Sequence, residues 1–358
     1  MPSPAHFEEI ADPAVLEPRW RAVEVAADDP SFFLRWTWIG SWLATLHAHD
    51  IPLPRLLVIG RDEGLALIGT GSAQCLLGRV PSLWLNQCGV PEGDRPFIEY
   101  NGLLCRDGDA VACVHGFCEA MAAERDWRRL YLSGLTFGSP LIDVPAVRRR
   151  TIRDASPACF VDLAKVREEG DYLALLSANT RAQIKRSMKD EPGEPELIAA
   201  TDLATVDDWL SDMHRMNAGH HQDNAWDSAF FRDFARALAH AGLANGSVEL
   251  LRVARGEETL GYLMNLVWAG RAMNYQSAFA PPRTPRSKPG LMCHAAAVDR
   301  YSTAGLSHYS LLAGKDRYKQ SLSTDAEMIE WWVLERADWR LEAEALLRRL
   351  FRRPSRAG

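Results

Sequence analysis

The stretch that decides the fold is residues 248–280, which read VELLRVARGEETLGYLMNLVWAGRAMNYQSAFA. Two short turns, at residues 255–258 and 270–271, divide it into three largely apolar runs. Apolar runs joined by turns this tight are typical of neighbouring antiparallel strands. We therefore expect a three-strand meander over residues 248–254, 259–269 and 272–280.

A proline-rich and basic segment, residues 281–290, follows the meander. It leads into a predicted helix over residues 291–303, and a further strand is predicted over residues 308–312. The amino end of a helix presents unpaired N–H groups and attracts anions. Because the segment contains Arg283, Arg286 and Lys288 and no acidic residue, this order indicates a site for a phosphorylated ligand. A solvated loop with basic residues is the alternative.

The two halves of the chain show the same order of elements with different residues. The first half predicts a tryptophan-rich helix over 36–46, strands over 55–60, 65–77, 82–87 and 97–104, a helix over 109–124 and a strand over 130–133. Before its meander, the second half predicts a basic helix over 181–189 and two amphipathic helices that begin near Asp202 and Asp227. We therefore expect an α/β (α+β) fold of two tandem units, each a mostly antiparallel sheet flanked by helices.

Length and composition agree with that organisation. At ~150 residues per domain, 358 residues correspond to about two domains, which we place at 1–160 and 161–358. Hydrophobic residues make up 47% and charged residues 25% of the chain, as in ordinary globular proteins. No apolar run approaches the ~20 residues that cross a bilayer, so no membrane span is predicted.

The first residues of the chain and its cysteines indicate the cellular compartment and whether a metal site is expected. The first residues lack the basic start and apolar run of a secretory signal, and we expect a cytoplasmic protein. The seven cysteines include no CxxC pair, so neither a disulfide framework nor a zinc site is predicted. Buried packing is the interpretation for them, and no metal is expected.

Four motifs carry a family resemblance. They read NTRAQIKRSMK at residues 179–189, YQSAF at 275–279, SKPGL at 287–291 and LAGKDRYK at 312–319. Together they resemble the GNAT acetyltransferases, and within them the branch of CelD-like and BioF2-like proteins and FemAB peptidyltransferases. The resemblance covers residues 165–325, and the tryptophan-rich first half resembles the degenerate leading domain of that branch. It implies a tandem GNAT fold, an acyl-CoA donor such as acetyl-CoA, and acyl transfer to an amine.

The donor site departs from the family pattern. Typical GNAT members hold the pyrophosphate with an Arg/Gln-x-x-Gly-x-Gly/Ala loop, whereas residues 283–290 contain one glycine. FemAB-like relatives use aminoacyl-tRNA instead, but a tRNA-binding protein is expected to be basic, and this chain has a net charge of -6. Acyl-CoA therefore ranks before tRNA as donor. The cofactor-binding residues implied are Arg283, Arg286, Ser287, Lys288, Gly290 and Leu291.

The resemblance and the chemistry together give candidate catalytic residues. The amine must lose a proton and the thiolate leaving group gains from a hydrogen bond. Tyr318 resembles the family's Tyr-Lys signature and is the candidate donor to the sulfur; a packed ring is the alternative. His221 is one candidate base, because it lies in a polar loop and the usual pKa of histidine is close to neutral pH. Glu99 is the other candidate, because its segment resembles one in these relatives.

A second group of residues is expected to hold the substrate, a small-molecule amine such as a sugar or amino-acid derivative. Its members are Arg181, Arg186, His220, Asp223, Tyr275, Ser277 and Lys319. Strand alternation leaves open which of Tyr275 and Ser277 faces the binding side. A FemAB-like transferase and a non-catalytic pathway scaffold remain the alternative functions, and no oligomeric state is predicted.

Overall fold

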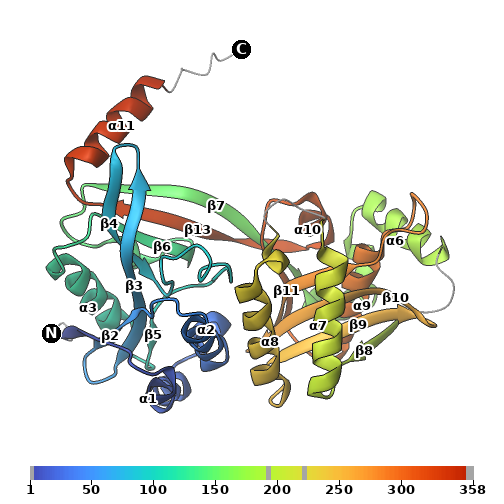
Figure 1. Cartoon of the computed structure of the whole chain (residues 1–358). Helices are drawn as coiled ribbons and strands as arrows, with labels where there is room; N and C mark the ends of the chain where they lie inside the picture. Colours follow the sequence, from blue (N-terminus) through green and yellow to red (C-terminus); the bar gives the residue numbers. More distant parts are fainter. Residues whose placement is uncertain (1–3, 191–194, 220–223, 352–358) are drawn as a thin grey trace. The chain divides into compact units, whose positions relative to one another are not determined.

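The computed structural model of the chain describes residues 4–190, 195–219 and 224–351, and it forms two compact units (Figure 1). Unit 1 comprises Met1–Trp36, Leu46–Ala155 and Glu330–Gly358. Unit 2 comprises Thr37–Thr45 and Ser156–Ile329. The predicted boundary between residues 160 and 161 lies inside strand β7 (Arg149–Asp162), and residues 330–351 cluster with unit 1.

Unit 1 is built on a sheet with the strand order β1-β2-β3-β4-β6-β13, and β5 pairs with β3. Its strands are β1 (Ala5–Glu8), β2 (Arg55–Ile59), β3 (Gly64–Cys75), β4 (Gly78–Leu85), β5 (Leu104–Cys105), β6 (Arg129–Thr136), the start of β7 (Arg149–Asp162) and the end of β13 (Asp325–Glu335). The helices are α1 (Pro13–Ala26), η1 (Phe32–Leu34), the ends of α2 (Trp36–Ala48), α3 (Ala110–Ala123), η2 (Pro140–Ile142) and α11 (Trp339–Phe351).

Unit 2 has the strand order β7-β12-β11-β10-β9-β8. Its strands are the end of β7 (Arg149–Asp162), β8 (Glu196–Ala199), β9 (Val248–Arg255), β10 (Glu258–Trp268), β11 (Arg271–Phe279) and β12 (His308–Ala313). The helices are α4 (Leu163–Glu169), α5 (Tyr172–Leu175), α6 (Ala178–Asp190), α7 (Leu203–Asn217), η3 (Ala225–Asp227), α8 (Ala229–Leu243), α9 (Pro289–Thr303) and α10 (Arg317–Leu322).

The two units share one topology. In unit 1, β2, β3 and β4 form an antiparallel meander, α3 follows, and β6 then pairs with β4 in parallel. In unit 2, β9, β10 and β11 form the meander, α9 follows, and β12 pairs with β11 in parallel. The prediction of a mixed α/β fold with mostly antiparallel sheets is confirmed, and the repeated order is the signature of a duplicated unit.

One predicted strand is wrong. Of residues 97–104, only the last joins the short strand β5, and the rest forms a loop. Tyr100 has a φ of 49°, a left-handed conformation that a strand does not contain. The amide of Asn101 then donates to the carbonyl oxygens of Leu85 and Ser133 at 3.1 and 2.9 Å. These side-chain bonds replace a strand ladder.

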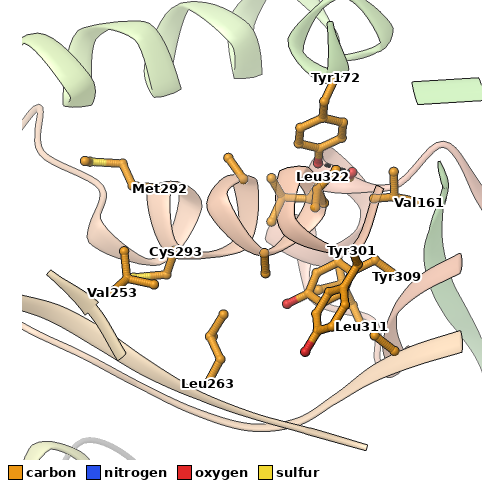
Figure 2. Packing of buried hydrophobic residues seen from close by; sticks show 14 of the residues in the cluster. Val161, Tyr172, Val253, Leu263, Met292, Cys293, Tyr301, Tyr309, Leu311 and Leu322 are labelled. Atoms are coloured by element: carbon orange, nitrogen blue, oxygen red, sulfur yellow. Dashed lines mark hydrogen bonds between the residues drawn. The ribbon is translucent and has the colours of Figure 1, made fainter. Parts of the chain in front are cut away.

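The two faces of the unit 2 sheet are covered by different helices. Leu263 on β10 packs into a cluster with Cys293 and Tyr301 of α9 (Figure 2). Its neighbour Tyr262 points the other way and donates a hydrogen bond to Asp212 of α7 at 2.6 Å. Since successive side chains of a strand alternate between faces, α9 lies on one face and α7 on the other. Each large apolar side chain buried in this way stabilises the fold by ~1.5–3 kcal/mol.

Candidate active site

The candidate site lies where β11 and β12 separate. The two strands pair in parallel from Arg271 and His308 as far as Met273 and Ser310, and within the described residues the remainder of β11 has no partner on β12. On its other side β11 pairs with β10, and the register shifts between Met264 and Asn265 so that Tyr275 is an extra residue. A bulge of this kind turns the strand and re-aims its side chains. The pairing of β11 with β12 therefore ends here, and we call the region between the unpaired ends of these two strands the V.

The bulge answers the question that alternation left open. Tyr275 points to the α8 face, where its ring contacts Trp38 and Phe231 with centroids 5.2 and 6.2 Å apart. Ser277 pairs with Leu263, which faces α9, and its hydroxyl donates to Oδ1 of Asn274 at 2.7 Å. The two predicted substrate residues therefore lie on opposite faces of the sheet.

The amino end of α9 opens beside this V. The backbone N–H of Lys288 donates to Oγ of Ser187 on α6 at 2.8 Å, and Ser287 is fully buried. A Cβ on Gly290 would lie 3.1 Å from the ring of Phe279. The contact with that ring is thus one reason for a glycine at this position. Leu291, at the third helical position, packs against the core of unit 2.

Basic side chains surround that helix end. Arg286 and Lys288 are exposed, and neither side chain has a hydrogen bond or ion pair with another described residue. Arg283 differs, because it pairs with Glu258 at 2.8 Å. On α6, whose Ser187 contacts α9, further basic residues line the solvent side. We call the exposed set the basic surface: Lys185, Arg186, Lys189, Arg286 and Lys288.

The guanidinium groups of the predicted anion-binding residues of α6 make hydrogen bonds to backbone carbonyl oxygens. Arg186 donates through Nε to the carbonyl oxygen of Ala182 at 3.1 Å, and Arg181 donates to that of Ala174 at 3.5 Å. Neither has a carboxylate partner among the described residues. Both guanidinium groups are therefore able to pair with an anionic ligand.

The short helix α10 presents Tyr318 and Lys319 at the end of β12. The ring of Tyr318 is 42% exposed and stacks on the imidazole of His294, with centroids 6.0 Å apart. Partial burial raises the pKa of Tyr318 to about 12, so its hydroxyl keeps its proton at neutral pH. The ammonium of Lys319 donates to the carbonyl oxygen of Ala313 at 2.7 Å, which holds it close to the chain turn after β12.

His294 belongs to this site although sequence reasoning did not select it. It is 1% exposed, and its Nδ1 lies 2.9 Å from the hydroxyl of Tyr309. The rings of Phe279 and Tyr318 cover it on two sides. Burial, together with the nearby charge of Lys319, lowers its pKa to about 3. The imidazole is therefore neutral throughout the working range.

The remaining predicted residues lie outside the described residues of unit 2. Glu99 is 8% exposed and lies in unit 1. His220, His221 and Asp223 lie outside the described residues. Within residues 4–190, 195–219 and 224–351, no cluster of three or more histidine, cysteine or acidic side chains is arranged to hold a metal ion. In the same ranges, no helix combines the length and apolarity needed to span a bilayer.

Comparison with known proteins places the site in a family. Residues 178–320 match the family described as acetyltransferase (GNAT) domain. This range begins with α6 and ends within α10, so it contains the V, the amino end of α9 and Tyr318. No curated protein sequence matches the chain.

Solved structures share the fold along nearly the whole chain. One is the C-terminal domain of a protein assigned as a lysylphosphatidylglycerol synthetase from Agrobacterium fabrum, with a TM-score of 0.59, 12% identity, and coverage of 94% of this chain and 96% of that one. The structure of FemX has a TM-score of 0.55, 9% identity and coverage of 97% and 100%. L-PGS from Bacillus licheniformis has a TM-score of 0.55, 10% identity and coverage of 96% and 97%.

The fold and the matched segment define an acyltransferase domain of the GNAT type. The resemblance to GNAT acetyltransferases read from the sequence is confirmed for residues 178–320, and FemX shares the fold.

Proposed function

We propose that the protein is a cytoplasmic N-acyltransferase that moves an acyl group from acyl-CoA to the amine of a small molecule, such as a sugar or amino-acid derivative. The observation that carries the proposal is the V between β11 and β12 with the amino end of α9 beside it. A thin, extended donor arm fits between parting strands, and the basic surface fits its phosphates.

Named residues then take roles in the reaction. Arg286 and Lys288 bind donor phosphates, and Arg181 and Arg186 bind an anionic part of donor or substrate. Tyr318, protonated at neutral pH, donates a hydrogen bond to the sulfur as it leaves. His221 and Glu99 remain the proposed bases, and Lys319 remains the proposed contact for a substrate carboxylate or phosphate.

The experiment is a thermal-shift titration with acetyl-CoA and CoA, followed by an assay of free thiol with a panel of amines. We expect a rise in melting temperature that the double variant Arg286→Ala, Lys288→Ala reduces. Arg236→Ala is the matched control, since Arg236 is an exposed arginine of α8 that pairs with Asp207 and belongs to no predicted site. A wild-type protein with no shift at millimolar acetyl-CoA would contradict the proposal.

A second function is supported by the extent of the basic surface over α6 and α9. A nucleic-acid backbone is bound by such rows of exposed cations, which favours a FemAB-like transfer from aminoacyl-tRNA as the competing proposal. Retention of charged tRNA at low salt, lost on Lys185→Glu, would select it. A catalytically silent scaffold is the third possibility, and any amine-dependent release of thiol from acyl-CoA excludes it.

A further inference from the structure

The imidazole of His294 has one satisfied nitrogen and one orphan. Nδ1 lies 2.9 Å from Oη of Tyr309, whereas Nε2 is buried and, within the described part of the chain, has no hydrogen-bond partner. The hydroxyl of Tyr309 is itself fully buried, and His294 is its hydrogen-bond partner. A buried polar atom left unpaired costs ~1–3 kcal/mol, so this pair requires an explanation.

The pairing decides where the imidazole proton sits. If Nδ1 carried the hydrogen and donated it to Tyr309, the tyrosine O–H hydrogen would be buried without an acceptor, in addition to the bare Nε2. If the tyrosine O–H donates to Nδ1, only Nε2–H is left unsatisfied. The second arrangement leaves fewer buried groups unpaired. The geometry therefore gives His294 a hydrogen on Nε2, and this N–H lacks an acceptor.

The orphan N–H belongs to a ring that is held between the parting strands. Phe279 is the last residue of β11, Tyr309 lies on β12, and both contact the imidazole. Tyr318 stacks over it from α10 and is the exposed member of the group. Among the described residues the Tyr318 hydroxyl makes no hydrogen bond, so its ring is able to turn without breaking one.

We propose that Nε2–H of His294 binds the carbonyl oxygen of the acyl group carried by the donor, once the Tyr318 ring has turned aside. This inference rests on the proposed function, because it assigns the V to an activated acyl donor. The ligand chemistry is an acyl carbonyl next to a leaving group. A thioester of CoA and an ester of a nucleoside both contain it.

The same contact serves the reaction. As the amine nitrogen bonds to the carbonyl carbon, the π pair of the C=O group moves to oxygen, and a fixed N–H stabilises the charge that develops there. The C=O bond then re-forms, the C–S bond breaks, and its electron pair leaves with sulfur. The proton lost by the amine nitrogen passes to the proposed base, and the thiolate takes a proton from water. His294 exchanges no proton in these steps, which suits a neutral imidazole.

The first test measures the tautomer and needs no ligand. Nitrogen-15 NMR of histidine-labelled protein distinguishes a protonated from a bare ring nitrogen, and His294→Phe assigns the signal. We expect a neutral ring with hydrogen on Nε2 from pH 5 to 8. Hydrogen on Nδ1, or a doubly protonated ring at pH 5, would overturn the inference.

The second test compares ligands with and without the carbonyl. We expect wild-type protein to prefer acetyl-CoA over CoA by roughly tenfold, the worth of one well-aligned hydrogen bond. His294→Phe should lose this preference and keep its affinity for CoA, and His294→Gln, which retains an N–H donor, should recover part of it. The melting temperature of each variant shows whether it is folded.

A second pair of ligands distinguishes failure of the carbonyl contact from failure of the proposed acyl-CoA donor. If CoA does not bind, the same comparison is made between adenosine and a stable 3′-aminoacylamino-adenosine. A preference that depends on His294 in this pair supports the carbonyl contact and moves the donor to aminoacyl-tRNA. An unchanged preference in His294→Phe, or no binding of either pair, refutes the contact.

Discussion

The hydroxyl of Ser187 on α6 accepts a hydrogen bond from the backbone N–H of Lys288 at 2.8 Å, and it donates its own hydrogen to the sulfur of Met292. Ser187 is fully buried. The Ser187 side chain of α6 thus accepts the hydrogen bond of the N-cap residue of α9 and also contacts Met292 in the first turn of that helix. α6 is therefore part of the framework of the proposed donor site as well as a carrier of basic residues.

Removing that hydroxyl should destabilise unit 2. Ser187→Ala leaves the buried N–H of Lys288 without its acceptor, and we expect a loss of about 1–2 kcal/mol in the free energy of unfolding. Urea denaturation measures it. Ser211→Ala on α7 is the control, because the Ser211 hydroxyl bonds to a carbonyl oxygen on an exposed helix face. Equal effects of the two changes would argue against the role of Ser187.

The buried arginine of unit 1 gives a larger prediction. Arg129 contacts Glu335 and Glu344 at 2.9 Å each, and all three side chains are almost inaccessible. Arg129→Met removes the buried cation that the two carboxylates share, while Glu335 keeps Arg149 and Glu344 keeps Arg348. We therefore expect a loss of ~1–3 kcal/mol, below the ~3–5 kcal/mol that is typical when a buried charge loses its partner completely. The exposed pair of Arg21 and Glu17 supplies the control, since Arg21→Met should cost less than ~1 kcal/mol. Chemical denaturation of both variants decides it.

His294 should make stability depend on pH. Its pKa is about 3 when folded and 6.5 when unfolded, so the unfolded state binds more protons between these values and stability rises with pH there. From pH 7 to pH 5 the group should remove about 2 kcal/mol. His294→Gln should lack this contribution of about 2 kcal/mol to the loss of stability. Unfolding curves at both pH values, subtracted between wild type and variant, test the sign; a steeper loss in the variant would contradict it.

Gly290 offers a test of packing at the start of α9. A Cβ there would meet the Phe279 ring at 3.1 Å, so Gly290→Ala should displace that ring at a cost of ~1–3 kcal/mol. Gly71→Ala is the control, because its Cβ would lie 3.4 Å from Trp84, an ordinary contact. If only donor binding changed and the melting temperature did not, the glycine would serve the ligand instead.

Local patterns predicted much of unit 2. The meander, α9 and β12 follow from apolar runs separated by tight turns, and the segment with Arg286 and Lys288 was found because basic residues gathered before a helix. Those signals lie within neighbouring residues. The false strand over residues 97–104 had the same local appearance, but the side chain of Asn101 made long-range bonds that no pattern contains.

The site itself required tertiary contacts. The rings around His294 belong to three separate segments of the chain: Phe279, Tyr309 and Tyr318. In the sequence, His294 has the pattern of an ordinary residue on the apolar side of a helix. These contacts leave Nε2 of His294 buried and, among the described residues, without a hydrogen-bond partner. The faces of Tyr275 and Ser277 were equally hidden, since one extra residue in β11 reverses the alternation.

The strand order of unit 1 has a consequence for how the protein is made. In its sheet β13 lies beside β6, and Glu335 bonds to Arg129 across 206 residues of sequence. At ~5–20 residues per second, a ribosome needs on the order of ten seconds or more between Ala155 and that glutamate. During this interval that edge of β6 has no partner, while strands β8 to β12 of unit 2 are being synthesised. Unit 1 therefore completes its sheet only after those strands have been made.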